Sequence, residues 1–213
     1  MEEKDFIYVY LYTYHFEFKK TKMCKNRIEY IKNDKFGDNY NNEKYFGWKL
    51  LETLFNEKLS IDINNLNPRR LETGKWVVDD YYISISNSGK YLMVGVSNEP
   101  IGVDVQRVSE SGSYCVYNNE MCSEEKEAFK DSKPWKYLLI HAEKEAIYKA
   151  FFGDKDYAWD EIKNRINVLE YKNKLTSYEY GEYYCSVCSD LIEKGVQINI
   201  AINRTDEQLI HLT

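Results

Sequence analysis

The sequence predicts an α+β protein, because segments with a hydrophobic period of two residues occur beside segments with the spacing of helices. Residues 6–14, FIYVYLYTY, alternate aliphatic residues with tyrosine and predict a strand covered on both faces. Residues 134–152 carry apolar side chains every three or four positions and predict a helix. Strand-like and then helix-like material occurs in each part of the 213 residues, which favours two similar halves, residues 1–98 and 99–213.

The predicted N-terminal half continues from the first strand into a polar stretch, residues 19–42, that we expect to be irregular or weakly helical. Residues 43–57 have helical spacing, and residues 60–80 have the Pro, Gly and Asp-Asp punctuation of a loop. Residues 81–106 contain three short alternating segments separated by turn residues, and we expect them to form a three-stranded meander.

The predicted C-terminal half begins with a short helix from about Ser123 and continues with the long helix over 134–152, which Gly153 ends. Alternating segments then predict four strands, near residues 165–170, 175–179, 183–189 and 195–203. In the last of these, valine and isoleucine occupy every second position from 196 to 202.

Charge and composition exclude several classes of function. The formal charge of -6 and pI of about 5.3 argue against nucleic-acid binding, although the basic run over residues 19–27 is either a solvated loop or a local patch. No apolar run approaches the ~20 residues of a membrane helix, and no signal peptide is expected. Five cysteines without an export signal suggest the reducing cytoplasm. Cys185 and Cys188 have C-x-x-C spacing, but on a strand they face opposite sides, which disfavours zinc.

Two segments carry residues suited to binding a metal ion. In the predicted strand IGVDVQ, Gly102, Asp104 and Gln106 share one face, and Asp is unusual in a strand. On the long helix, Glu145 and Lys149 are four residues apart and share a face, which is also what an ordinary surface ion pair looks like. Two carboxylates and a carboxamide suit Mg²⁺, which leaves ligand positions open for substrate phosphates.

These segments resemble the Sfp-type 4′-phosphopantetheinyl transferases. IGVDVQ, followed about forty residues later by AEKEAIYKA, is similar to their paired G-[IV]-D-[IV]-[EQ] strand and W-[ST]-x-K-E-[AS]-x-x-K helix. ISISNSGKY resembles their F-x-[IL]-S-H-S-G turn, ETGKW their E-x-G-K-P loop, and CSEEKEAF their [FC]-[ST]-x-x-E segment. The five elements occur in the family's order between residues 72 and 152.

The resemblance implies two α+β halves related by pseudo-twofold symmetry, with the active site between them. It implies Mg²⁺-dependent transfer of the phosphopantetheine arm of coenzyme A to a serine of an acyl, peptidyl or aryl carrier protein, releasing 3′,5′-ADP. Asp104, Glu145 and Gln106 are then the metal ligands, and Glu145, or a water it holds, is the base. Lys149 contacts the pyrophosphate, and the other residues expected to bind coenzyme A are Gly74, Lys75, Ser86, Asn87 and Lys44.

Three residues depart from the family pattern. Gln106 stands where many members have Glu, Asn87 where the turn usually has His, and His141 where the helix usually has Trp. We expect His141 to be a packing residue beside Ala142. An alternative hypothesis is therefore a module that keeps the fold and binds a nucleotide or a protein without turnover. A cytoplasmic interaction protein with an accidental motif match is a further alternative.

Overall fold

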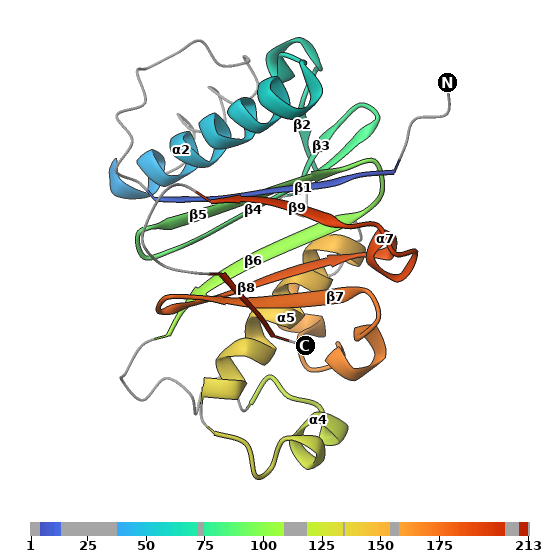
Figure 1. Cartoon of the computed structure of the whole chain (residues 1–213). Coiled ribbons are helices and arrows are strands. Elements are labelled where there is room, and N and C mark those ends of the chain that lie inside the picture. The colour runs from blue at the N-terminus through green and yellow to red at the C-terminus, as the bar shows by residue number, and fades with distance from the viewer. Residues whose placement is uncertain are drawn as a thin grey trace.

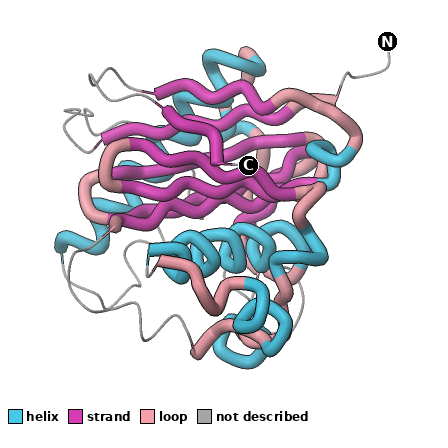
Figure 2. The backbone as a smooth tube through the Cα atoms, turned by 60° about the horizontal axis from the view of Figure 1, so that its bottom comes forward, coloured by secondary structure: helices cyan, strands magenta, loops and turns pink. Residues whose placement is uncertain are grey.

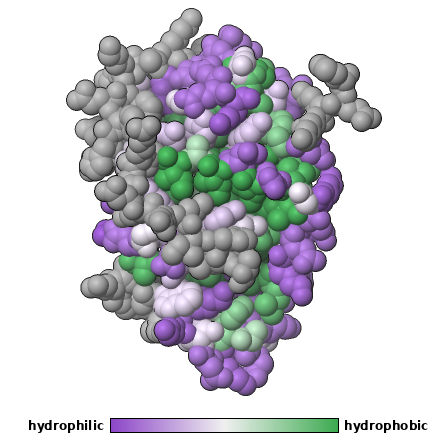
Figure 3. Space-filling model, viewed as in Figure 1, coloured by the Kyte–Doolittle hydropathy of each residue, from purple (hydrophilic) through white to green (hydrophobic). Residues whose placement is uncertain are grey.

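The computed structural model describes residues 5–13, 38–71, 75–108, 119–133, 135–153, 158–202 and 209–212. The described chain contains two β-sheets between two main helices (Figures 1 and 2). Helix α2 (Asp38–Leu54) covers the first sheet, and helix α5 (Trp135–Phe151) lies against the second. Hydrophobic residues gather at the level of the strands, with hydrophilic residues above and below them (Figure 3). This mixed α+β architecture agrees with the sequence-based fold class, whereas the symmetry of two halves stays a prediction.

The first sheet, here called sheet A, has the strand order β2-β3-β4-β5-β1-β9. Its bounds are β1 (Ile7–Thr13), β2 (Arg69–Arg70), β3 (Trp76–Val78), β4 (Tyr81–Ser88), β5 (Tyr91–Ser97) and β9 (Ile198–Ile202). Strand β9 pairs in parallel with β1, while the other pairs are antiparallel. Residues from both predicted halves therefore build sheet A, and the division at residue 98 stays a prediction.

The second sheet, sheet B, has the strand order β10-β7-β8-β6 and is antiparallel throughout. Its strands are β6 (Ile101–Arg107), β7 (Leu175–Tyr180), β8 (Tyr183–Ser189) and β10 (Leu209–Leu212). The smaller helices are α4 (Ser123–Ala128), α6 (Trp159–Ile162) and α7 (Asp190–Glu193), with helical turns at η1 (Phe55–Leu59), η2 (Ile63–Asn65) and η3 (Val168–Tyr171).

Four hydrophobic clusters of described residues hold these layers together, and three of them are large. The two faces of β1 contribute to two different clusters. Ile7, Val9 and Leu11 pack between the sheets, while the tyrosines of β1 pack towards α2. The third cluster lies under α5 and includes Ala146 and Ile147. Because each face of sheet A meets a different layer, the predicted double-sided burial is confirmed for residues 6–13, and Tyr14 lies outside the described residues.

The predicted meander over 81–106 is wrong in its third strand. Strands β4 and β5 form the expected hairpin, but β6 pairs with β8 in sheet B. Both edges of β5 are already occupied, by β4 on one side and by β1 on the other, so β6 has no free edge of β5 to join.

Two other expectations also need correction. The strand predicted near 165–170 is instead the 3-10 turn η3, whereas β7, β8 and β9 lie where strands were expected. The segment 60–80, predicted to be a loop, contains η2 and the short strands β2 and β3. The polar stretch 19–42 lies outside the described residues up to 37, and its last residues belong to α2.

Candidate functional site

Strand β6 presents Asp104 to helix α5. Its residues Ile101, Val103 and Val105 pack between the two sheets, so the period of two turns Gly102 and Asp104 to the opposite face. Asp104 is fully buried, and a buried carboxylate requires hydrogen-bond partners or a counter-charge. The strand therefore holds a single acidic group at a fixed place beneath the helix.

Serines of β4 attach this strand to sheet A. Ser84, Ser86 and Ser88 accept hydrogen bonds from the backbone N–H groups of Val103 (3.0 Å), Val105 (3.3 Å) and Arg107 (3.0 Å), respectively. Strand β6 is an edge strand of sheet B, so these hydroxyls satisfy N–H groups that would otherwise be unpaired. Ser86 also donates to Asp104 Oδ1 at 2.7 Å, which links the contact between β4 and β6 to the candidate site.

Gly102 allows α5 to lie directly on β6. A Cβ atom built on Gly102 would meet the carbonyl oxygen of Ala146 at 1.8 Å and the backbone nitrogen of Ala150 at 2.7 Å. No side chain therefore fits at this position while the helix stays in place. The close approach brings Glu145 and Lys149, which flank Ala146 on the helix, over Asp104.

Lys149 lies between the two carboxylates. Its Nζ atom is 2.5 Å from Asp104 Oδ1 and 3.0 Å from Glu145 Oε2. Gln106 completes the cluster by donating from its amide nitrogen to Asp104 Oδ2 at 3.0 Å. The side chains of Lys149 and Glu145 are about a quarter exposed, whereas Asp104 is closed off from solvent. The predicted Glu145–Lys149 pair is thus joined to the strand and is not a simple surface pair.

The electrostatics of the cluster follow from burial and mutual proximity. Burial, and then repulsion by Glu145, raise the pKa of Asp104 to about 6, despite the opposing effect of Lys149. Burial disfavours the charge on Glu145, but Lys149 and His141 outweigh it and hold the pKa of Glu145 below its usual range. Burial likewise opposes the charge on Lys149, yet Asp104 and Glu145 raise its pKa above the ordinary value. Lys149 stays cationic, and Glu145 stays ionised at neutral pH.

His141 makes two polar contacts in addition to the packing expected from its place in the sequence. Its Nδ1 atom is 2.5 Å from Glu120 Oε2, and its Nε2 atom is 3.2 Å from Glu145 Oε1. Burial lowers the pKa of His141, but its hydrogen bonds to Glu120 and Glu145 outweigh this effect and raise the pKa to about 9. The imidazolium therefore extends the charged cluster away from Asp104.

The other lysine of the AEKEAIYKA segment is structural. Lys144 is fully buried, and its Nζ atom lies 2.7 Å from Glu125 Oε2 and donates to the carbonyl oxygens of Lys163 and Ile166. Glu125 in turn accepts from the backbone N–H of Cys122 and of Val168. Every proton of the Lys144 ammonium group therefore has an acceptor, which is the condition for keeping a buried ion pair.

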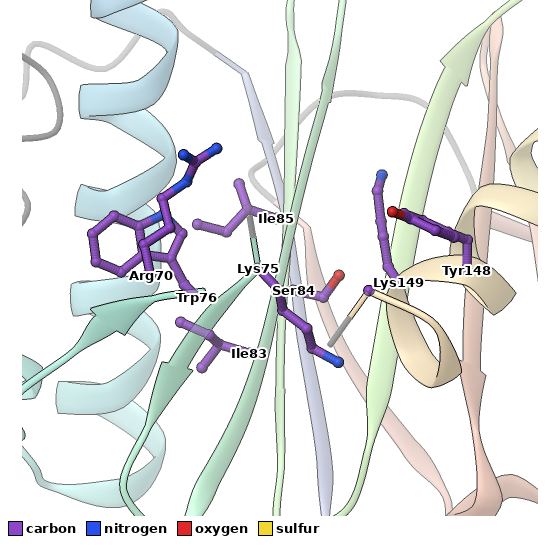
Figure 4. A pocket seen from close by; sticks show the side chains of 9 residues that line it. Arg70, Lys75, Trp76, Ile83, Ser84, Ile85, Tyr148 and Lys149 are labelled. Carbon is purple, nitrogen blue, oxygen red and sulfur yellow. The ribbon is translucent and has the colours of Figure 1, made fainter. Parts of the chain in front are cut away.

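A cavity of about 270 Å³ opens beside Lys149 (Figure 4). It lies between sheet A and the C-terminal end of α5, and three cationic side chains, Arg70, Lys75 and Lys149, line it together with Trp76 and Tyr148. The remaining lining residues are Ile83, Ser84, Ile85 and Gly153. Lys75 Nζ also donates to the carbonyl oxygen of Ala150 at 3.4 Å, which anchors this side chain to the end of the helix. Three cations around one cavity favour an anionic ligand.

The residues predicted to bind coenzyme A are only partly gathered at this cavity. Lys75 and Lys149 line it, whereas Ser86 is not a lining residue but donates a hydrogen bond to Asp104. Asn87 is exposed on β4, and Lys44 is half-buried on α2; neither is among the residues that line the cavity. Gly74 lies outside the described residues.

Sequence reasoning missed Arg70, Trp76 and Tyr148 as cavity residues. Arg69-Arg70 lies one residue before ETGKW, so a basic pair close to a recognised loop was a usable signal. Tyr148 precedes Lys149 on the helix, but the helical period alone did not distinguish a residue that faces a cavity from one that faces the core.

The chain is similar to a 4′-phosphopantetheinyl transferase. It is 30% identical over 159 residues to 4′-phosphopantetheinyl transferase gsp from Aneurinibacillus migulanus, a match that covers 67% of this chain and 66% of that protein. No family model matches the chain. The similarity points to the 4′-phosphopantetheinyl transferase family, and the chain spans about two thirds of the length of this relative.

The candidate site contains oxygen atoms of the kind that bind a magnesium ion. The described residues contain no group of three or more His, Cys, Asp and Glu side chains arranged to hold a metal. They do contain Asp104 and Glu145 facing one cation, with the Gln106 carboxamide beside them. Two carboxylates with an amide oxygen and substrate phosphates match the oxygen ligands that Mg²⁺ prefers, so the donor set fits.

The two cysteines of the C-x-x-C segment do not contribute to such a site. Cys185 packs in the cluster between the sheets, and Cys188 packs under α5, so they face opposite sides of β8 as expected. Burial raises the pKa of both thiols, which keeps them protonated. Among the helices of the described residues, none is long and apolar enough to cross a membrane.

Proposed function

We propose that this protein transfers the 4′-phosphopantetheine arm of coenzyme A to a serine of an acyl, peptidyl or aryl carrier protein, in the manner of the Sfp-type enzymes. The observation that carries the proposal is the cluster of Asp104, Lys149 and Glu145 beside a cavity lined by cations. The similarity to a transferase of this name supports the same reaction.

In the proposed reaction, the serine oxygen of the carrier forms a bond to the phosphorus that bears the pantetheine arm. The bond between that phosphorus and the bridging oxygen of the pyrophosphate breaks, and the electron pair leaves with 3′,5′-ADP. Glu145, or a water that it holds, accepts the serine proton, because Glu145 is ionised, about a quarter exposed and paired with Lys149, which lines the cavity. Lys149 stabilises the charge that develops on the leaving phosphate.

Asp104, Glu145 and Gln106 would hold the Mg²⁺ that the proposal requires, and the bound ion would supply charge stabilisation at the phosphate oxygens. Asp104 is suited to this role because its partner Ser86 and the strand fix its orientation. Gln106 brings an oxygen ligand without a charge, so its contribution to metal affinity is smaller than that of a carboxylate.

Arg70 and Lys75 are proposed to bind the phosphates of coenzyme A. Both line the cavity, Arg70 from strand β2 and Lys75 immediately before β3. The guanidinium of Arg70 matches a phosphate with two parallel hydrogen bonds, whereas Lys75 acts as a point charge. These local cations allow a protein of net charge -6 to bind an anionic nucleotide.

Other parts of the proposal rest on the chemistry of the partners. Carrier proteins of these classes are usually acidic, so we expect an acidic enzyme to dock them through apolar contacts and a limited basic patch. We further propose that the reaction takes place in the cytoplasm, without membrane or nucleic-acid partners.

One experiment tests the proposed function directly. The protein is incubated with coenzyme A, Mg²⁺ and a panel of apo acyl, peptidyl and aryl carrier proteins, and each carrier is weighed by mass spectrometry. We expect at least one carrier to gain one phosphopantetheine group, and chelation of Mg²⁺ to prevent the gain. A protein that binds coenzyme A in calorimetry but modifies no carrier is the binding module without turnover, and that result overturns the proposal.

A further inference from the structure

We propose that His141, supported by Glu120, is a positioning residue that fixes the carboxylate of Glu145 for metal binding and proton acceptance. This inference rests on the proposed function and deepens it. It concerns a helix position at which the resembling family usually has tryptophan, so it describes a feature of this chain rather than of the family.

The geometry of His141 is that of a bridge between two acids. Its two ring nitrogens face different carboxylates, Glu120 Oε2 at 2.5 Å from Nδ1 and Glu145 Oε1 at 3.2 Å from Nε2. Because a carboxylate only accepts hydrogen bonds, both nitrogens donate and both carry a proton. A tryptophan here would offer one N–H group and could not join both acids.

Neighbouring side chains hold His141 and Glu120 in place. The side chains of His141 and Glu120 are each about nine-tenths buried, and Lys163 Nζ lies 3.5 Å from Glu120 Oε1 on the far side. The ring of Trp159 on α6 meets the edge of His141, with centroids 5.9 Å apart, and also contacts Tyr148 at 5.4 Å. Packing and charge together leave the imidazole little freedom to rotate.

The consequence falls on Glu145. His141 holds Oε1, and Lys149 Nζ lies 3.0 Å from Oε2, so the two oxygens have distinct neighbours and the plane of the carboxylate is fixed. Along the cluster, charges alternate from Lys163 through Glu120, His141 and Glu145 to Lys149. Supporting hydrogen bonds of this kind orient metal-binding and catalytic carboxylates, and their loss typically lowers metal affinity or activity about 10–100-fold.

The test compares His141→Phe, His141→Gln and Glu120→Gln with the wild type. We expect His141→Phe, which keeps a ring against Trp159, to lower kcat about 10–100-fold and to raise the Mg²⁺ concentration for half-maximal rate. KM for coenzyme A should stay within about twofold, because the proposed phosphate cations Arg70 and Lys75 lie outside this bridge. His141→Gln, which can still donate to Glu145, should recover part of the loss.

A matched control is Glu127→Gln. Glu127 is an exposed acid, 75% exposed, paired with Lys130, and its substitution should leave kcat and the Mg²⁺ dependence unchanged, whereas Glu120→Gln should alter both. If folded His141→Phe keeps the wild-type kcat and Mg²⁺ dependence, or loses only thermal stability, His141 is a packing residue and the inference is wrong.

A second readout does not depend on activity. The chain has three histidines, so nitrogen NMR of ¹⁵N-histidine-labelled protein can resolve the ring of His141. We expect two N–H signals for this ring, with the Nε2 signal shifted by Glu145→Gln and the Nδ1 signal shifted by Glu120→Gln. If neither N–H signal shifts in these two variants, His141 does not join Glu120 to Glu145 and the inference is wrong. If the signals respond but the wild type modifies no carrier, the bridge stands and the proposed function fails.

Discussion

Replacing Gly102 with alanine tests the most specific contact of the candidate site. The new Cβ atom would lie 1.8 Å from the carbonyl oxygen of Ala146, whereas ordinary contacts begin at 3.4 Å, so α5 and β6 must separate by about 1.6 Å. The obstacle is backbone, which cannot rotate away as a side chain can. Adding one methyl group here therefore displaces the whole middle of the helix.

The expected magnitude follows from this displacement. Overpacking a well-packed interior typically costs about 1–3 kcal/mol of unfolding free energy. Moving the helix by about 1.6 Å also lengthens the 2.5 Å contact between Lys149 Nζ and Asp104 Oδ1 to about 4 Å, beyond hydrogen-bonding range. Because a misplacement of about 1 Å can lower a rate ~10²-fold, transfer should fall by at least that factor.

The assay combines urea unfolding with transfer to the best apo carrier, both at a temperature where the variant is folded. Gly47→Ala is the matched control, since Gly47 lies where α2 packs on sheet A, and its Cβ would meet side-chain methyl groups alone, of Ile85 at 3.1 Å and of Leu92 at 3.7 Å. We expect the control to change stability by less than about 1 kcal/mol and to keep its activity, because alanine also favours the helix. A folded Gly102→Ala protein with transfer within a few-fold of the wild type would refute the argument that this glycine sets the helix over Asp104.

Four further predictions test the site and its charges. Glu145→Gln should lower transfer about 10²–10⁴-fold in a protein that still unfolds cooperatively; turnover within a few-fold of wild type would contradict its role as base. Gln106→Glu should lower the Mg²⁺ concentration for half-maximal rate, since a third carboxylate joins the site, and a rise in that concentration would argue against Gln106 as a ligand. Lys75→Ala should weaken coenzyme A binding in calorimetry more than it lowers the saturated rate, and unchanged binding would remove Lys75 from the nucleotide site. His141 has a pKa of about 9 in the folded protein, against about 6.5 in the unfolded chain. Its protonation should therefore stabilise the fold by at most about 3 kcal/mol, fully below pH 6.5 and no longer once the pH has risen through 9. The difference in unfolding free energy between wild type and His141→Gln, measured by urea unfolding, should shrink across that pH window.

The sequence by itself determined the local structure where a period was clear. The alternation in residues 6–14 predicted a strand covered on both faces, and the pattern near 183–189 predicted a further strand; β1 and β8 lie in the sheets at these places. The helical spacing near 134–152 likewise located α5. The order of five short motifs indicated the transferase family, and a similar protein of that name agrees with it. These features were readable because each depends on neighbours within a few residues along the chain.

Only the tertiary structure decided which partner each face meets. A period of two shows that Asp104 and Gly102 share a face, but it does not show that α5 lies on that face or that β6 leaves the β4–β5 hairpin for sheet B. The serines of β4 alternate with isoleucines in the sequence, but that pattern does not show that they close the edge of β6.

The same limit applies to charged residues on one helix. Lys144 and Lys149 belong to one motif, but Lys144 lies in a buried pair with Glu125, and Lys149 lies beside a cavity. His141 looked like packing because its acidic partner, Glu120, comes from a separate segment. Periodicity along an element specifies the direction of a side chain, whereas its charge state and role depend on groups that folding brings from distant parts of the chain.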